Sequence, residues 1–146
     1  MSIEENKAVV RRYREAHNTN NLSLLDDVLA PTFVAHDMMP NVPQTIEGAK
    51  MVHQGGIAVF PDAQVRTDAL IAEGDKVVEQ WTMIAHHTGA PFFVGNIPPS
   101  GNKVEVTGIS TYRIAGGKIA ETWSNMDFLG VLQQVGVIPP PAPPGR

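Results

Sequence analysis

The residues best suited to chemistry lie in the segment ETWSNMDFLGVLQQVG, residues 121–136. This segment has the pattern of a β-strand that leads directly into a short apolar helix, with Asp127 at the junction. The apolar residues after Asp127 fall at helical spacing and require burial, so the carboxylate lies at the edge of an apolar region. A carboxylate there can cap the helix, which is the commoner role, or transfer protons, and the two roles can coexist.

Alternation along two strands groups further candidates with this carboxylate. In the strand 118–127, Trp123, Asn125 and Asp127 share one face, and in the strand from residue 76, Trp81 and His87 share one face. If the two tryptophans lie on the same side of the sheet, all five residues form one wall of a pocket. We expect an apolar surface with a few convergent polar groups, as in small-molecule sites.

Motif searches leave cofactor-free acid–base chemistry as the remaining prediction. The chain has no cysteine, and its adjacent histidines, residues 86 and 87, diverge in a strand, so we predict no metal site. No glycine-rich phosphate loop, dinucleotide motif or serine-nucleophile motif follows a strand, so we predict no cofactor. Lone histidines such as His36 and His87 are more often structural than catalytic, and each stays an open candidate.

The first half of the chain predicts three helices. Ser2 and Glu5 have capping-box spacing before a helix that turns Tyr13 inward, and Pro31 stops a second, short helix. An extended piece then carries His36. Thr45 is positioned to cap a third helix that ends before Pro61, with Phe60 on its apolar side. Its two consecutive glycines, residues 55 and 56, predict close approach of another backbone or a ligand.

The second half changes to a period of two. Residues 64–72, 77–87, 103–114 and 118–127 read as strands, joined by tight turns except for a long apolar loop at 88–102. We expect the loop residues Phe92 and Phe93 to fold over a cavity or into a subunit interface. Helices followed by an antiparallel meander predict an α+β domain whose helices cover one face of a curved sheet.

Composition limits the classes of protein to consider. The chain has 146 residues, a net charge of −4 and a pI of about 5.7, with no basic cluster, so nucleic acid is not expected as a partner. No signal peptide or membrane-length apolar run is present, which predicts a cytoplasmic protein without membrane association. We expect one domain at residues 1–136 and a proline-rich extended tail at residues 137–146.

Ordered sequence blocks resemble one family across nearly the whole chain. The blocks are FVAHD, LIAEGDKVVEQWT, HTG, IPPSGNKVEVTGISTYRIAGGKIAETW and the aspartate followed by FLGVLQQVG. Together they resemble the SnoaL-like polyketide cyclases. The resemblance implies the cone-shaped α+β barrel shared with nuclear transport factor 2 and ketosteroid isomerase. It also implies intramolecular aldol ring closure without metal or cofactor, with an aspartate as acid and base.

The resemblance assigns roles to several residues. Asp127 matches the family's catalytic aspartate, His87 matches the histidine of the family's H-T-G segment, and His36 matches the histidine that closes F-V-x-H. An apolar wall disfavours the charged form of a carboxylate, which would help Asp127 both to accept and to return a proton. We expect four aromatic residues to shape a cavity for a small hydrophobic or polycyclic substrate: Tyr13, Phe60, Trp81 and Trp123.

Other functions remain compatible with the same residues. An isomerase or an epoxide hydrolase could use the same acid–base groups, and a non-catalytic ligand-binding or assembly domain would need Asp127 only as a cap. The outer sheet face carries several apolar positions, so we expect a homodimer or a higher homo-oligomer.

Overall fold

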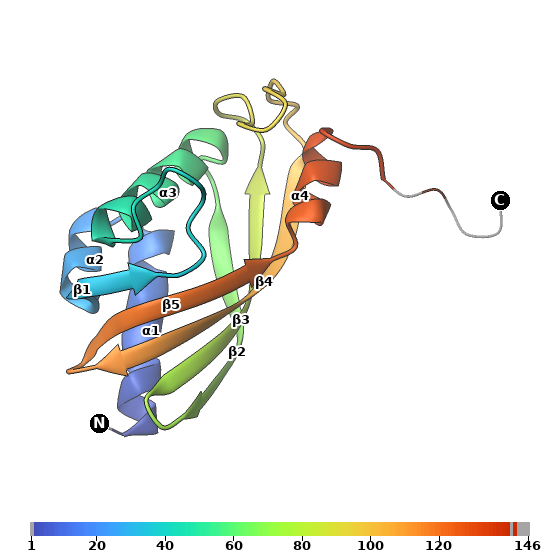
Figure 1. The fold of residues 1–146 in the computed structure, drawn as a ribbon. Coiled ribbons are helices and arrows are strands. Elements are labelled where there is room, and N and C mark those ends of the chain that lie inside the picture. Colours follow the sequence, from blue (N-terminus) through green and yellow to red (C-terminus); the bar gives the residue numbers. More distant parts are fainter. Residues whose placement is uncertain (1, 141, 143–146) are drawn as a thin grey trace.

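The computed structural model describes residues 2–140 and 142, which form four helices and one five-stranded sheet (Figure 1). The sheet order is β1-β5-β4-β3-β2, and β1 is parallel to β5 while the other neighbours are antiparallel. In chain order the elements are α1 (Ile3–Asn18), α2 (Leu22–Val28), β1 (Leu29–Ala35), α3 (Ile46–Val59), β2 (Gln64–Glu73), β3 (Lys76–His86), β4 (Lys103–Ala115), β5 (Lys118–Met126) and α4 (Phe128–Val135).

The helix boundaries follow from the local sequence. Ser2 and Glu5 form the predicted capping box at the start of α1, and Thr45 caps α3. Gly136 ends α4 in the left-handed conformation, with φ of 94°, which glycine adopts without the steric penalty of a Cβ. The prediction of helices followed by an antiparallel meander is therefore confirmed.

The sheet has two chemically different faces. We call the face covered by helices the inner face, and it contains the buried side chains of Val77, Glu79 and Ala85 on β3. Helix α1 packs on β2 near one end of this face, and α4 packs on β4 near the other end (Figure 1). The opposite face, which we call the outer face, has no helix packed on it among the described residues.

Two expectations about backbone and loop packing need correction. No protein atom lies within 4 Å of a Cβ placed at Gly55 or Gly56, so the predicted close approach of another backbone is wrong. The two phenylalanines of the apolar loop between β3 and β4 differ in burial, so only one of them could cover a cavity or interface. Phe92 is 1% exposed inside the core, whereas Phe93 is 60% exposed and packs on Phe128.

The chain after α4 is described in part. Val137 and Ile138 turn back so that their amides donate to the Leu132 carbonyl, at 2.9 and 3.3 Å. Most of the predicted proline-rich tail beyond residue 140 lies outside the described residues. Among the described residues, none of the helices is both long and apolar enough to cross a membrane.

The two neighbouring phenylalanines give a matched test of the packing. Phe92→Ala should lower the free energy of unfolding by about 3–5 kcal/mol because it empties a buried ring site. Phe93→Ala should lower it by about 1 kcal/mol or less, because the ring is 60% exposed and loses only its contacts with Phe92 and Phe128. Chemical denaturation of both variants measures the difference. Equal losses in the two variants would contradict this packing.

Candidate active site

The strand register separates the two tryptophans that were expected to form one wall. Trp81 pairs with Gly108 on β4, while Trp123 pairs with Thr111. Gly108 and Thr111 are three residues apart in one strand, so the side chains of Trp81 and Trp123 lie on opposite faces. The single-wall prediction is wrong, because strand alternation fixes faces only within a strand and the stagger between strands decides the rest.

Three of the predicted site residues nevertheless line one hollow. A hollow of about 440 Å³ spans the middle of the sheet, mainly on its outer face, and Trp81, Asn125 and Asp127 all line it. Gly108 lies against the Trp81 ring, so a Cβ at this position would overlap the indole. The remaining lining residues are Asp68, Gln80, Thr107, Ile109 and Met126.

Asp127 caps α4 and is exposed at the rim of this hollow. Its Oδ1 accepts a hydrogen bond from the Gly130 amide at 2.9 Å, and its own amide donates to the Thr107 carbonyl at 2.9 Å. The cap fixes the carboxylate between the end of β5 and the start of α4. One oxygen holds the helix, and the other has no hydrogen-bond partner among the described residues.

Asp68 lies on the same hollow and is held in place. Its two oxygens accept hydrogen bonds from Arg66 Nε at 2.7 Å and Thr82 Oγ1 at 2.6 Å. These bonds, first that from Thr82 and then that from Arg66, keep the pKa of Asp68 below its usual range. The carboxylate therefore remains charged near neutral pH.

The two candidate histidines lie elsewhere. His87 is fully buried against Phe60 and Phe92, and its Nε2 contacts the Ala90 carbonyl at 3.1 Å. Phe60 is part of that same core cluster. Neither His87 nor His36 forms a hydrogen bond with Asp127 in the described chain, so the expected histidine–aspartate contact is absent there.

His36 belongs to a separate cluster on the outer face. Its ring stacks on Trp123, with centroids 4.7 Å apart, and its Nε2 lies 2.6 Å from Glu121. Arg113 Nε donates to the same carboxylate at 2.6 Å. His36 and Arg113 hold the pKa of Glu121 below its usual value. This arrangement resembles a surface ion-pair network more than a catalytic site.

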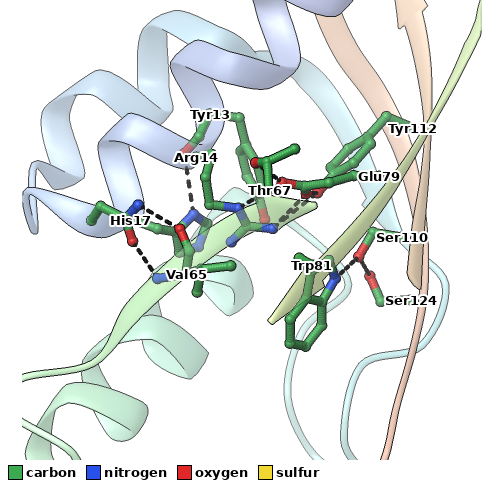
Figure 2. Close-up of polar contacts among 11 residues, drawn as sticks. Tyr13, Arg14, His17, Val65, Thr67, Glu79, Trp81, Ser110, Tyr112 and Ser124 are labelled. Carbon is green, nitrogen blue, oxygen red and sulfur yellow. Dashed lines mark hydrogen bonds and ion pairs between the residues drawn. The ribbon is translucent and has the colours of Figure 1, made fainter. Parts of the chain in front are cut away.

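Sequence reasoning missed a charged cluster on the inner face (Figure 2). Glu79 is 0% exposed, and its carboxylate accepts from Arg14, Thr67 and Tyr112 at 2.6–3.1 Å. Burial disfavours the charged carboxylate, but the contacts from Arg14, Thr67 and Tyr112 outweigh it and keep the pKa of Glu79 low. A glutamate at the same alternation position as Trp81 was the available signal for this cluster.

A separate chain of side-chain hydrogen bonds lies beside the Glu79 cluster and reaches β5. The Trp81 indole N–H donates to Ser110 Oγ at 3.0 Å, and Ser110 Oγ lies 2.8 Å from Ser124 Oγ (Figure 2). Glu79, Ser110 and Ser124 are directly paired across three strands, so they form one row. The indole of Trp81 is thus anchored on the inner face while the residue also borders the hollow.

Tyr13, on α1, packs against Tyr112 of the Glu79 cluster with ring centroids 5.4 Å apart, and His17 lies one turn further along the helix. Burial, together with the charges of Glu79 and Asp37, raises the pKa of Tyr13 to about 12 despite the nearby Arg14. His17 contacts the rings of Tyr13 and His53, with centroids 4.5 and 4.8 Å apart. Burial and then the charge of Arg14 lower the pKa of His17 to about 3. Within residues 2–140 and 142, no three His, Asp or Glu side chains lie close enough to hold a metal.

Comparison with known proteins agrees with this fold. The family model for SnoaL-like polyketide cyclases matches residues 7–135. TsrD from Streptomyces laurentii superposes with a TM-score of 0.83 and 27% identity, covering 94% of this chain and 99% of TsrD. No curated protein sequence matches the chain.

Two further structures show similar agreement. AclR from Streptomyces galilaeus, a proposed hydroxylase, has a TM-score of 0.82 and 27% identity over 97% of this chain and 87% of AclR. IdmH from Streptomyces antibioticus, a proposed polyketide cyclase, has a TM-score of 0.78 and 27% identity over 90% of this chain and 98% of IdmH. The cone-shaped α+β fold implied by the sequence is confirmed.

The low pKa of His17 predicts a loss of stability in acid. The unfolded chain protonates this residue below its ordinary pKa of 6.5, whereas the folded protein resists protonation until about pH 3. The contribution of this residue to the free energy of unfolding is therefore fully present above pH 6.5. It is lost as the pH falls from 6.5 toward 3. Between pH 7 and pH 5 the loss should reach about 2 kcal/mol.

Denaturation of wild type and His17→Gln at both pH values measures this contribution. The variant should be less stable at pH 7 and should lose less stability between pH 7 and pH 5 than wild type. His86→Gln is the matched control, because His86 is partly exposed and pairs with Asp62 at the surface. An identical pH dependence in wild type and His17→Gln would disprove the assignment.

Proposed function

Because the chain belongs to the SnoaL-like polyketide cyclase family, we propose that it is a cofactor-independent enzyme that acts by general acid–base catalysis. Its substrate is a polyketide-like or cyclic carbonyl compound, and its reaction is an intramolecular aldol ring closure. The observation that supports this best is the gathering of Trp81, Asn125 and Asp127 around one hollow. A volume of about 440 Å³ falls in the usual range for small-molecule sites.

Asp127 is the proposed acid and base. One of its oxygens is occupied by the Gly130 amide, and the other has no described partner, so the carboxylate is oriented yet can accept a proton. It takes a proton from carbon next to a carbonyl group and returns it to the alkoxide formed on ring closure. Asn125, on the same rim, can donate a hydrogen bond to a carbonyl oxygen of the substrate.

The two candidate histidines do not line the hollow. His36 and His87 were expected to hold the carboxylate or polarise the substrate carbonyl, and each now has a different set of contacts. Trp81 borders the hollow, but its indole lies on the inner face and donates to Ser110, so Ile109 and Met126 supply the other apolar lining. Tyr13, Phe60 and Trp123 do not line this hollow.

Hydrolysis by an activated water molecule is the second candidate. A water nucleophile must be held by several polar groups. The hollow offers four beyond Asp127: Asp68, Gln80, Thr107 and Asn125. This polar rim favours an epoxide hydrolase over a double-bond isomerase, which needs no bound water.

We further propose that the protein is a homodimer that buries the outer face. Ile109 is 49% exposed in the centre of this face and lines the hollow. Val78, Ile84 and Thr111 are half-buried on the same face. A second copy seated there would cover the hollow and exclude water from Asp127, which strengthens its electrostatic interactions.

Two substitutions distinguish the capping role of Asp127 from its proposed catalytic role. Asp127→Asn keeps a capping oxygen but cannot accept a proton, so it should retain wild-type stability and lower turnover about 10²–10⁴-fold. Asp127→Ala should in addition lower the free energy of unfolding by about 0.5–2 kcal/mol. Turnover of an uncyclised polyketide ester and chemical denaturation measure the two effects. Wild-type turnover by a folded Asp127→Asn protein would exclude the catalytic role.

A substitution at the centre of the proposed interface tests the dimer prediction. Ile109→Glu places a charge in the proposed interface and should convert a dimer into a monomer at micromolar concentration, measured by light scattering. Ile109 is half exposed in the single chain, so the substitution should change the free energy of unfolding of the monomer by less than about 0.5 kcal/mol. A wild-type protein that is already monomeric at this concentration would refute the proposed interface. Met51→Glu is the control, because Met51 is 52% exposed on α3, away from the outer face.

A further inference from the structure

Two phenylalanine rings form an exposed aromatic surface where the loop between β3 and β4 meets the start of α4. The rings of Phe93 and Phe128 are stacked, with centroids 6.3 Å apart and planes 27° apart. Both side chains are exposed. The buried ring of Phe92 contacts both, with its centroid 4.6 Å from that of Phe93 and 6.4 Å from that of Phe128. We call Phe93 and Phe128 the aromatic patch.

The aromatic patch is held in place by the backbone around it. The Phe92 amide donates to the Ile97 carbonyl at 2.8 Å, which closes the tip of the loop. On α4, the Gln134 side chain accepts from the Glu105 amide at 2.8 Å and donates to the Glu105 carbonyl at 2.9 Å, which fixes the helix on β4. A surface that is fixed in advance loses less conformational entropy when a partner binds. Exposed apolar surface of this kind is typical of interaction sites.

The segment that follows α4 begins beside the same loop. Val137 lies next to Gly95, because a Cβ placed on Gly95 would be 3.7 Å from Val137 Cγ1. The Val137 amide donates to the Leu132 carbonyl at 2.9 Å, which anchors the start of the segment on α4. The described part of the chain after this anchor leads away from the helix and the sheet (Figure 1). The segment therefore starts beside the loop that carries Phe93 and points away from its own subunit.

The sequence of residues 139–146, PPPAPPGR, favours a straight conformation. Proline fixes its own φ at about −65° and disfavours the helical conformation of the residue before it. Five of these eight residues are proline, so the preferred conformation is polyproline II, which rises about 3.1 Å per residue. This preference is a property of the sequence, since most of the segment lies outside the described residues. A straight segment that points away from its own subunit reaches a neighbouring molecule before it can reach its own patch.

The segment and the aromatic patch have matching chemistry. Proline has no amide hydrogen to donate and presents an apolar ring, so a proline-rich segment binds mainly by apolar contact. Three residues form one turn of polyproline II, so Pro140 and Pro143 lie on one face of the segment. Aromatic surfaces bind such segments well, because a segment that is already extended loses little entropy on binding. Phe93 and Phe128 supply two such rings side by side.

We propose that the aromatic patch binds residues 139–146 of a second copy of this chain, and that two copies exchange these segments. In a two-fold dimer the same contact occurs twice, because the patch of each copy receives the segment of the other. Phe128 directly follows Asp127 at the rim of the hollow, so the patch borders the outer face that is proposed to be buried between copies. Tethering through the outer face raises the local concentration of each segment, and the exchange tightens the dimer.

This inference rests on the proposed homodimer and adds a second contact to it. The exchange covers apolar rings that the single chain leaves in solvent. Of the two loop phenylalanines, Phe93 is the one that is accessible to a partner, since Phe92 is inside the core. The inference assigns no catalytic role to the patch or to the segment.

Two variants of the full chain remove the two sides of the contact. Phe93→Ala removes one ring of the patch, and Pro140→Gly combined with Pro143→Gly removes two proline rings and frees the backbone. If each contact contributes about tenfold to dimer affinity, as an aromatic anchor can, either variant homodimer loses both contacts and should be weakened about 100-fold. Analytical ultracentrifugation measures the dimer dissociation constants. Met51→Ala is the matched control, because Met51 is exposed on α3, and it should leave the constant unchanged.

A mixture of the two variants tests exchange between copies. The Phe93→Ala chain keeps an intact segment and the double glycine variant keeps an intact patch, so their mixed dimer retains one of the two contacts. The mixed dimer should therefore be about tenfold tighter than either variant homodimer. A segment that docks on its own subunit would give no such gain. A mixed dimer no tighter than the homodimers, or wild-type affinity in either variant, would overturn the exchange.

The outcomes also separate this inference from the proposed outer-face interface. If Ile109→Glu dissociates the dimer while both variants keep wild-type affinity, the outer-face dimer stands and the exchange fails. If both variants weaken the dimer and the mixture recovers affinity while Ile109→Glu has no effect, the exchange stands and the outer-face interface fails. A wild-type chain that is monomeric throughout the micromolar range overturns both.

Discussion

The buried carboxylate of Glu79 is the constraint on which most of this structure depends. A charged group without solvent exposure is tolerated because Arg14, Thr67 and Tyr112 together saturate its oxygens. These partners come from α1, β2 and β4, so one carboxylate joins a helix to three neighbouring strands. Loss of one partner from such a pair typically costs about 3–5 kcal/mol, because the remaining charge stays buried.

The same constraint gives the two faces of the sheet different chemistry. The Glu79 cluster fills the centre of the inner face and ties Arg14 in place, while the sheet places Asp127, Asn125 and Asp68 around the hollow on the other side. The two regions meet at Trp81, whose indole is bonded to Ser110 and whose residue also lines the hollow. A sheet one backbone thick can thus present different chemistry on its two faces, and the register decides which residue serves which face.

The similar structures carry different proposed activities on the same fold. IdmH is a proposed polyketide cyclase and AclR a proposed hydroxylase, and each shares 27% identity with this chain. A fold that accepts different reactions keeps its helices and strands and varies the groups that face the substrate. In this chain the proposed acid and base, Asp127, follows the end of β5 and is exposed as the cap of α4.

The sequence alone determined the elements and the faces within each strand. The capping residues Ser2 and Thr45, the change of period near residue 64 and the cap at Asp127 are local features that depend on neighbouring residues. The alternation that places Trp81 with His87, and Trp123 with Asn125, is local as well. The family resemblance added the cone-shaped arrangement of these elements.

Tertiary structure decided which faces meet and which polar groups remain unpaired. The pairing of Trp81 with Gly108 and of Trp123 with Thr111 sets the tryptophans on opposite faces, and no local pattern contains that stagger. Arg14 and Glu79 are 65 residues apart, so their ion pair is invisible until α1 packs on the sheet. Alternation is a property of one strand, whereas register, burial and partner choice depend on the packing of distant segments.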